Sequence, residues 1–153
     1  MHLLMAAAPI VLYMIALGLG FLGVHQPFGS LALPPTLQWM LTLGLGVPSL
    51  WAAVGHGLNS ERVAKSIGWQ TSPFQKEIAG ANLGIGLGAI AASTGGPSAA
   101  WTMFFMAAAF LWSAAAVHVI DMRQRKNFAI NNAGPIFWWD IITPITILLL
   151  LLW

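Results

Sequence analysis

Long uncharged stretches, separated by short polar or proline-rich segments, define the pattern of this chain. Residues 1–60 contain no Lys, Arg, Asp or Glu, and residues 78–120 contain none either. HQPFGSLALPPT (25–36) and STGGPS (93–98) interrupt the apolar runs, because their prolines and glycines stop a helix. A membrane-spanning helix needs about 20 mostly apolar residues. The pattern therefore predicts five spans, at about 3–24, 36–57, 73–92, 98–121 and 134–153.

Local signals mark where two of these helices begin. In TSPFQKE, Ser72 is expected to cap the third span, and Gln75 completes a capping box around Pro73. Asn132 and Pro135 are placed in the same way at the start of the fifth span. These signals agree with the boundaries that the apolar runs indicate.

A short amphipathic segment, NSERVAKSIGW (59–69), connects the second and third spans. It predicts an interfacial helix at about 60–67, capped by Ser60 and lying in the plane of the membrane surface. The polar face carries Arg62 and Lys65 toward the lipid headgroups. The apolar face consists of three residues that we expect to contact acyl chains, namely Val63, Ile67 and Trp69.

The composition indicates a membrane protein. Only 7% of the residues are charged and 58% are hydrophobic, with a mean hydropathy of +0.79. Soluble domains carry about 25% charged residues. We therefore predict an all-α integral membrane protein, with residues 1–153 forming one transmembrane domain in the lipid bilayer. The net charge of +2 is too small for a nucleic-acid partner, and the lack of cysteine excludes disulfides and thiolate chemistry.

All six basic residues fall on one side of the predicted bundle, which we call the basic end: Arg62, Lys65, Lys76, Arg123, Arg125 and Lys126. With five alternating spans the amino terminus lies on this side, and the carboxyl terminus lies on the other, the uncharged end. Basic residues mark the cytoplasmic side of a membrane protein. The charge pattern thus predicts a five-transmembrane-helix bundle with its amino terminus inside and its carboxyl terminus outside.

Four of the predicted spans each place one ionisable side chain near the basic end: His56, Glu77, His118 and Asp140. Asp140 lies about 7–8 Å into its helix and Glu77 about 6 Å into its own, at a rise of about 1.5 Å per residue. Gln75 and Asn82 add amide groups on the third span. Ionisable groups inside a bilayer usually face the bundle interior, paired or hydrated. We therefore predict a polar cluster that opens toward the cytoplasm.

The two remaining acids lie at predicted helix ends. Glu61 and Asp121 are expected to be solvated there, or paired with Arg62 and Arg123. Neither is assigned to the polar cluster.

The cluster allows three interpretations. Its members satisfy one another and hold the helices in register, as in a non-catalytic accessory subunit of a larger membrane complex. Alternatively, they bind a small cation, a transported proton or a small polar ligand, and a divalent metal would be held by His56, Glu77, His118 and Asp140. A third interpretation is haem ligation by His56 and His118, which the nearby carboxylates disfavour. No nucleophile lies beside a base, so the sequence favours a role without catalysis.

Small residues on the third span predict how it packs. Gly80, Gly84 and Gly88 form a stripe along which we expect a close helix neighbour. Glu77 continues this stripe and is expected to face the same neighbour. Glycine-lined helices in so small a bundle also indicate assembly into a homo-oligomer.

Two prolines within the spans predict kinks. Pro48 and Pro144 lack the N–H groups that would reach the carbonyls of Gly44 and Asp140. We expect the second and fifth spans to deviate from regular helix at these positions.

Two segments, SERVAKSIGWQTSPFQKEIAGANLGIG (60–86) and HVIDMRQRKNFAINNAGPIFWWDIITP (118–144), resemble an uncharacterised family of small multi-pass bacterial and archaeal membrane proteins. The positions that carry the resemblance are Glu61, Gly68, Trp69, Ser72, Pro73, Phe74, Gln75, Glu77, Asn82, His118, Asn132, Gly134, Pro135, Trp138 and Asp140. Gln70 replaces the proline that follows the Gly-Trp pair in many members. The resemblance implies a location in the cytoplasmic (inner) membrane of a bacterium or archaeon, and it supports the polar cluster without indicating a chemistry.

Overall fold

The computed structural model describes residues 2–153, with side chains from residue 6 onward, and these residues form helices and loops without a β-strand. The helices are α1 (His2–Phe21), α2 (Pro35–Trp39), the π-helix η1 (Met40–Gly46), α3 (Val47–Leu58), α4 (Ser60–Ile67), α5 (Phe74–Gly95), α6 (Pro97–Arg125), α7 (Ile130–Ala133) and α8 (Pro135–Leu152). The prediction of an all-helical protein is therefore confirmed.

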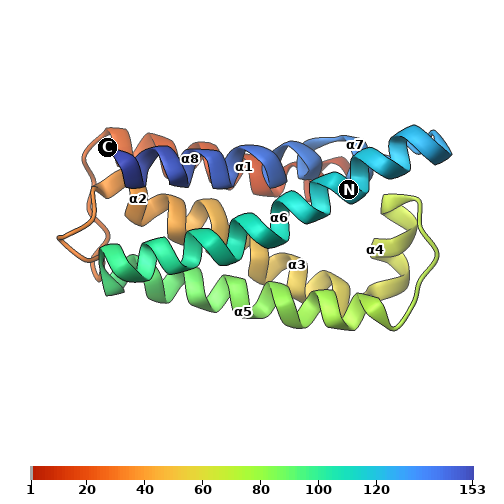
Figure 1. Cartoon of the computed structure of the whole chain (residues 1–153), viewed down its shortest axis with the longest axis horizontal. Coiled ribbons are helices and arrows are strands. Elements are labelled where there is room, and N and C mark those ends of the chain that lie inside the picture. Colours follow the sequence, from red (N-terminus) through yellow and green to blue (C-terminus); the bar gives the residue numbers. More distant parts are fainter. Residues whose placement is uncertain (1) are drawn as a thin grey trace.

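Four helical segments are long and apolar enough to cross a membrane: Pro35–Leu58, Phe74–Gly95, Pro97–Arg125 and Ile130–Leu152. The apolar part described for α1, Ala6–Phe21, is shorter and packs alongside α8 (Figure 1). The chain is thus a helical membrane protein, whereas the fifth span and the orientation stay predictions. The interfacial helix expected at about 60–67 corresponds to α4, Ser60–Ile67.

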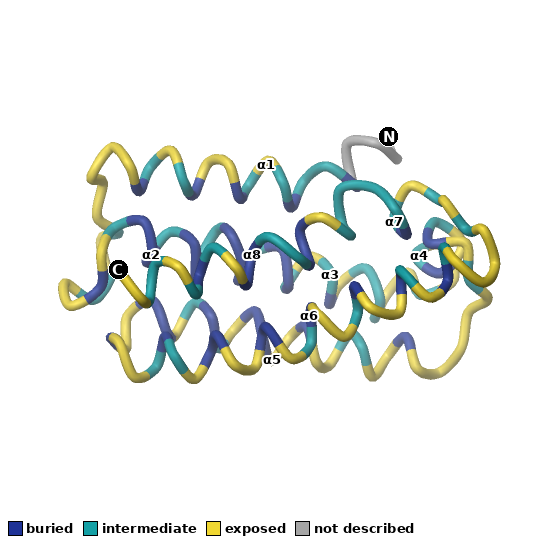
Figure 2. The backbone as a smooth tube through the Cα atoms, turned by 45° about the horizontal axis from the view of Figure 1, so that its top comes forward, coloured by how far each residue is buried: buried dark blue, intermediate teal, exposed yellow. Residues whose placement is uncertain are grey.

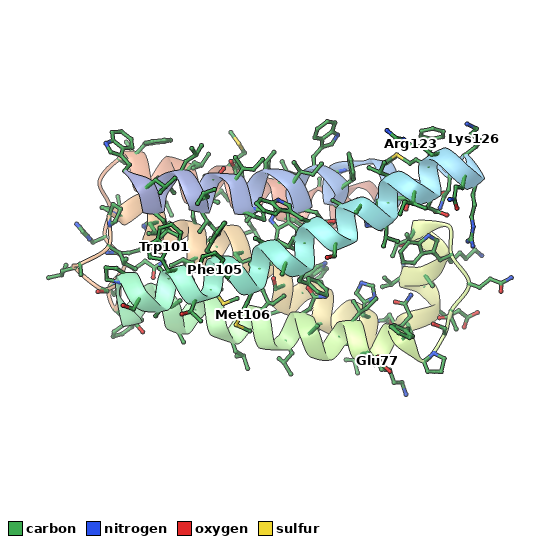
Figure 3. The ribbon with its side chains drawn as sticks, in the orientation of Figure 1. Glu77, Trp101, Phe105, Met106, Arg123 and Lys126 are labelled. Atoms are coloured by element: carbon green, nitrogen blue, oxygen red, sulfur yellow. The ribbon has the colours of Figure 1, made fainter. Side chains whose placement is uncertain are left out.

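The long helices lie side by side (Figure 1). α1 packs against α8 and η1, α5 packs against η1, α3 and α6, and α6 packs against α8. The basic end holds α4, α7, the start of α5 and the end of α6, where Figure 3 shows Arg123 and Lys126. The two ends of the bundle therefore differ in charge, as the sequence pattern requires.

The tightest packing lies toward the uncharged end. Met40, Leu41 and Leu45 of η1 are fully buried and belong to the same core as Ala89 of α5 and Ala107 of α6. Figure 2 shows buried positions on the inward sides of the helices and exposed positions along the outward sides of α1 and α5. Many of the outward residues are large and apolar, so lipid rather than water is the solvent that suits this surface.

Pro48 shapes the second membrane helix through its missing N–H. In η1 the helix is widened, and the Val47 N–H bonds to the carbonyl of Thr42, five residues earlier. Pro48 follows at the start of α3 and cannot donate to the Gly44 carbonyl. The indole N–H of Trp139 on α8 donates to that carbonyl instead, at 2.8 Å. A neighbouring helix therefore satisfies a carbonyl that lipid could not.

The glycine stripe predicted on the third span is wrong at two of its positions. A Cβ at Gly80 or Gly84 would meet no described atom within 4 Å, so both glycines lie on the outer face of α5. At Gly88 a Cβ would lie 3.0 Å from a methionine sulfur. The close approach between helices is at Gly46 and Gly86 instead, where a Cβ on Gly86 would lie 3.0 Å from the Gly46 carbonyl oxygen. Glycines occupy two faces of α5, and spacing alone does not show which face meets η1.

Two predicted helix caps are also wrong, because α4 and α5 begin without a side-chain cap bond from Ser60 or Ser72. Pro73 precedes α5 without a side-chain cap from Ser72, and Gln75 extends to His56. The hydroxyl of Ser60 donates to the His56 carbonyl one turn earlier. The Gln75 side chain therefore joins α5 to α3, and the Ser60 side chain joins α4 to α3.

At the uncharged end, the buried amide of Gln38 holds the connection between α1 and α2. Its Nε2 donates to the carbonyls of Ser30 and Leu33 at 2.9 and 3.0 Å, and its Oε1 accepts the Gln26 N–H at 3.0 Å. The Gln26 side chain donates back to the Gln38 carbonyl at 2.8 Å and accepts from Thr42. These reciprocal hydrogen bonds hold the connection between α1 and α2 against the start of the second membrane helix.

Candidate functional site

A cavity of about 500 Å³ lies in the basic half of the bundle, among α3, α6 and α8 and next to α4. Most of its wall is apolar and includes Trp51, Phe110 and Trp139. The polar side chains on the wall are His56, Asn59, Arg62, Ser66, Asn82, Ser113, His118, Asn131 and Asp140. Cavities of about 300–1,000 Å³ with an apolar wall and a few polar groups are typical of small-molecule sites.

The cavity is accessible from outside the bundle. Trp51 on α3 and Val117 on α6 both line it and are 51% and 47% exposed. Asn59 and Arg62, nearer the basic end, also line it and are exposed. A molecule can therefore reach the interior without the core at the uncharged end having to open.

Asp140 is the buried carboxyl group on the cavity wall. Its side chain belongs to α8 and the residue is only 4% exposed. Among the described residues no hydrogen-bond donor contacts it, and the nearest basic atom is Nε2 of His118 at 3.8 Å from Oδ2. A buried carboxylate without donors is stabilised only by a proton or by a cationic partner. The carboxyl of Asp140 is therefore a group available to a molecule in the cavity.

The hydrogen bonds of Asn132 determine which atom His118 presents to Asp140. Asn132 Nδ2 donates to the Asn127 carbonyl at 2.7 Å, so its Oδ1 is the atom 2.7 Å from His118 Nδ1. Because an amide oxygen only accepts, we assign the ring hydrogen of His118 to Nδ1. The neutral ring then directs the lone pair of Nε2 toward Asp140. Asn132, expected to cap the last helix, orients this histidine from α7 instead.

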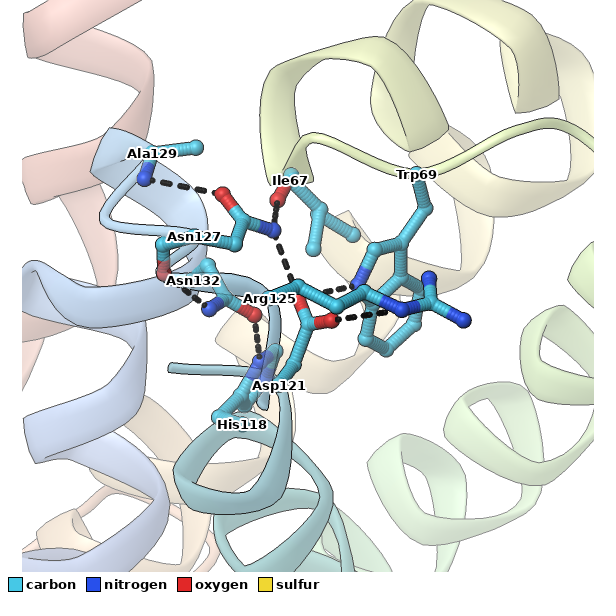
Figure 4. Close-up of polar contacts among 8 residues, drawn as sticks. All are labelled: Ile67, Trp69, His118, Asp121, Arg125, Asn127, Ala129 and Asn132. Carbon is cyan, nitrogen blue, oxygen red and sulfur yellow. Dashed lines mark hydrogen bonds and ion pairs between the residues drawn. The ribbon is translucent and has the colours of Figure 1, made fainter. Parts of the chain in front are cut away.

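A polar network joins the ends of α4 and α6 above this histidine (Figure 4). Oδ2 of Asp121 accepts hydrogen bonds from Trp69 Nε1 at 2.9 Å and from Asn127 Nδ2 at 2.6 Å. Oδ1 of Asp121 lies 3.6 Å from Nε of Arg125. The Trp69 ring also stacks on the His118 ring, with centroids 5.6 Å apart and an interplanar angle of 23°. The network fixes His118 from a second side.

Two left-handed backbone positions bring the network together. Gly68 follows α4 with φ 85°, and Lys126 follows α6 with φ 55°, so the chain turns directly after each of these helices. The following residues, Trp69 and Asn127, are thereby placed at Asp121. A Cβ on Gly68 would lie 2.6 Å from Asn127 Oδ1, so a larger residue there would displace the amide.

Several interpretations of these residues are corrected. Asp121 was expected in a wet helix end beside Arg123, but it is 6% exposed and contacts Arg125. Trp69 was expected to face acyl chains, but its N–H bonds to Asp121. Ile67, assigned to the same lipid-facing side, is buried at 7% exposure. α4 therefore packs its apolar face on the protein, because the cavity and α7 lie beneath it.

The remaining members of the predicted polar cluster are divided between two faces. His56 Nδ1 contacts Gln75 Oε1, and Asn82 Nδ2 donates to the Ile78 carbonyl at 3.0 Å. His56 and Asn82 line the cavity, as His118 and Asp140 do. Glu77 is exposed and lies along the outer edge of α5 in Figure 3. The expectation that Glu77 faces a packed helix is wrong, because the glycine face that it continues is the outer one.

The predicted metal ligands do not converge. Among the described residues, no three His, Asp, Glu or Cys side chains are arranged so that they could hold one metal ion. The displacement of Glu77 removes one carboxylate from the proposed set. His118 and Asp140 are the pair that the structure brings together.

Trp69, Asp121, Asn127 and Asn132 form the part of the site that sequence reasoning missed. The pairing of Trp69 with Asp121 joins residues 52 positions apart, beyond any local signal. Trp69 and Asn132 do stand among the motif positions of the resemblance, which is the one signal that singled them out.

The apolar helices and the internal cavity define a helical membrane protein with a pocket inside its bundle. The chain belongs to the family described as "Family of unknown function (DUF6790)", which matches residues 2–153. The expected membership of an uncharacterised family is thereby confirmed. No curated protein and no solved structure matches the chain. The family description names no chemistry, so the function has to be argued from the site.

Proposed function

We propose that this protein binds a small amphipathic organic molecule inside the membrane. The observation that carries the proposal is the cavity of about 500 Å³, with its apolar wall and the donor-free carboxyl of Asp140. The apolar body of the ligand packs against Trp51, Phe110 and Trp139. Its polar head reaches Asp140 and His118.

The site geometry favours an organic ligand over a divalent metal. A metal needs several converging ligands, whereas Asp140 and His118 form only a pair among the described residues. Haem ligation by His56 and His118 is disfavoured because Nε2 of His118, the ring nitrogen left free to bind iron, lies 3.8 Å from the carboxyl of Asp140.

An accessory role in a larger complex explains only part of the site. Asp121 has donors and a nearby guanidinium, as a purely structural carboxylate requires. Among the described residues Asp140 has neither, although it is as buried as Asp121. Packing alone gives no reason for a carboxyl group at this position, and ligand binding does.

The proposal includes the topology that the charge pattern indicates. α1 forms a fifth span, the basic end faces the cytoplasm, and the protein resides in a bacterial or archaeal inner membrane. In this arrangement the cavity is reached from the cytoplasmic half of the bilayer. A second copy or another membrane protein would meet the bundle on its outer faces, where Gly80 and Gly84 leave α5 flat.

Binding is tested with four eight-carbon probes that differ only in head group: 1-octanol, octanoate, octylammonium and octyltrimethylammonium. The protein is placed in nanodiscs of zwitterionic lipid, and calorimetry is corrected with protein-free nanodiscs. We expect saturable binding of at least one probe with a stoichiometry of one.

Two matched variants locate the bound probe. Ala114 lines the cavity, so Ala114→Phe fills it and removes binding. Ala116 is on the exposed face of the same helix, so Ala116→Phe retains binding. If none of the four probes binds, or if both variants bind equally well, the proposed function is wrong. A Soret band in the purified protein would instead support the haem interpretation, and a stoichiometric metal would support the metal interpretation.

A further inference from the structure

We propose that the head group this cavity selects is a protonated amine carrying at least two N–H bonds. The inference rests on the proposed function and specifies the chemical class of its ligand. The observation that supports it is a pair of hydrogen-bond acceptors, His118 Nε2 and Asp140 Oδ2, which face each other on the cavity wall.

Both facing atoms accept hydrogen bonds when Asp140 is ionised, and a cation bound in the cavity would keep it ionised. With the ring hydrogen on Nδ1, His118 Nε2 can only accept, and the carboxylate of Asp140 can only accept. Their separation of 3.8 Å is too long for a direct hydrogen bond. A nitrogen placed about 2.8 Å from each atom would donate one N–H to each. An ammonium group also supplies the positive charge that a buried carboxylate needs.

The aromatic wall suits the same charge. Trp51, Trp139 and Phe110 line the cavity, and aromatic faces attract cations while packing against an apolar chain. Of the described lining residues Arg62 alone carries a positive charge, and it is exposed on α4. An anionic head group would therefore meet Asp140 without a buried positive partner.

The four eight-carbon probes separate this inference from the broader proposal. We expect octylammonium to bind at least tenfold more tightly than 1-octanol, octanoate or octyltrimethylammonium. The quaternary compound carries the charge without N–H groups, so it isolates the contribution of hydrogen-bond donation.

Two carboxylate variants provide the matched comparison. Asp140→Asn removes the charge and is expected to lower octylammonium affinity at least tenfold and to abolish the preference for octylammonium over 1-octanol. Glu77→Gln removes a carboxylate on the outer face of α5 and is expected to change neither affinity. Asp140→Glu keeps the charge and is expected to retain part of the preference for octylammonium. A cooperative melting transition like that of the unchanged protein shows that a variant is folded.

Several outcomes would overturn the inference and leave the proposed function in place. One is equal affinity for octylammonium and 1-octanol, and another is tighter binding of octanoate. Equal affinity for the primary and the quaternary ammonium would show that charge alone is recognised, which contradicts donation to His118 and Asp140. Failure of all four probes to bind would remove both proposals.

Discussion

Asp121 and Asp140 show how the immediate surroundings divide the roles of two buried carboxylates. Asp121 receives hydrogen bonds from Trp69 and Asn127 and lies beside the Arg125 guanidinium. Asp140 receives none from the described residues and faces a histidine lone pair. The protein therefore supplies all the partners that the Asp121 carboxylate needs. The Asp140 carboxyl needs a proton or a bound cation in addition.

Replacing the indole donor should measure the structural role of Asp121. Trp69→Phe keeps an aromatic ring for stacking on His118 but loses the hydrogen bond to a buried carboxylate. We expect the free energy of unfolding to fall by about 1.5–3 kcal/mol, the range for hydrogen bonds to charged groups. Denaturant titration in mixed micelles gives this value.

Trp138 provides the comparison, because it is 56% exposed on α8 and has no role in the network. Trp138→Phe should change the free energy of unfolding by less than about 0.5 kcal/mol. Equal effects of the two substitutions would show that the Trp69–Asp121 bond does not hold the basic end together.

At the scale of helices, the contact between η1 and α5 depends on two facing glycines. Gly46 and Gly86 let the helices approach until a Cβ on Gly86 would lie 2.7 Å from the Leu50 side chain. Pro48 and Trp139 complete the same region, because an indole N–H from α8 satisfies the carbonyl that the proline leaves free. The second membrane helix is thus shaped by close contacts on two sides.

Leucine substitutions on two faces of α5 should separate packing from lipid contact. Gly86→Leu inserts a side chain against Leu50 and the Gly46 carbonyl, so we expect a loss of stability of about 1–3 kcal/mol or more. Gly84→Leu adds a side chain where no described atom lies within 4 Å, so we expect little change. Thermal melting of both variants in the same detergent makes the comparison. A larger loss for Gly84→Leu would return the helix contact to the outer glycine face.

Hydropathy and punctuation predicted the helices well for a physical reason. Each long helix must carry about 20 apolar residues, and proline or glycine ends it. The same reasoning could not predict which glycine face of α5 meets η1, because Gly84 and Gly86 differ only in their neighbours on other helices. It also misplaced Glu77, whose direction was inferred from the wrong face.

The candidate site was predictable only in part. His56, Glu77, His118 and Asp140 were expected to lie at similar depth in one cluster. His56, His118 and Asp140 line the cavity, whereas Glu77 is exposed. The supporting network was not predictable, because Trp69 and Asp121 are 52 positions apart and their capping and interfacial signals had simpler local explanations. Local sequence signals show which side chains can form hydrogen bonds, whereas the tertiary structure determines the partner of each.

At the scale of the whole molecule, the charged groups and the cavity share one end. The described bundle places its basic residues near α4 and the end of α6. At the opposite end, Gln38 holds the connection between α1 and α2. The charge pattern predicts that the basic end faces the cytoplasm.

Single introduced thiols can test this topology, since the chain has no cysteine. In intact bacterial cells that express the protein, a membrane-impermeant maleimide should label Phe28→Cys, because Phe28 is 87% exposed in the connection between α1 and α2. Lys126→Cys should be labelled only after the membrane is permeabilised. A cysteine added at the amino end should behave like Lys126→Cys if α1 spans the bilayer. The reverse labelling pattern would place the basic end outside.

The packed core of η1, α5 and α6, in which Met40, Leu41 and Leu45 are fully buried, separates the cavity from the uncharged end. A solute that enters beside Trp51 and Val117 would have to leave on the same side of this core. Passage from one end of the bundle to the other would first require this core to open.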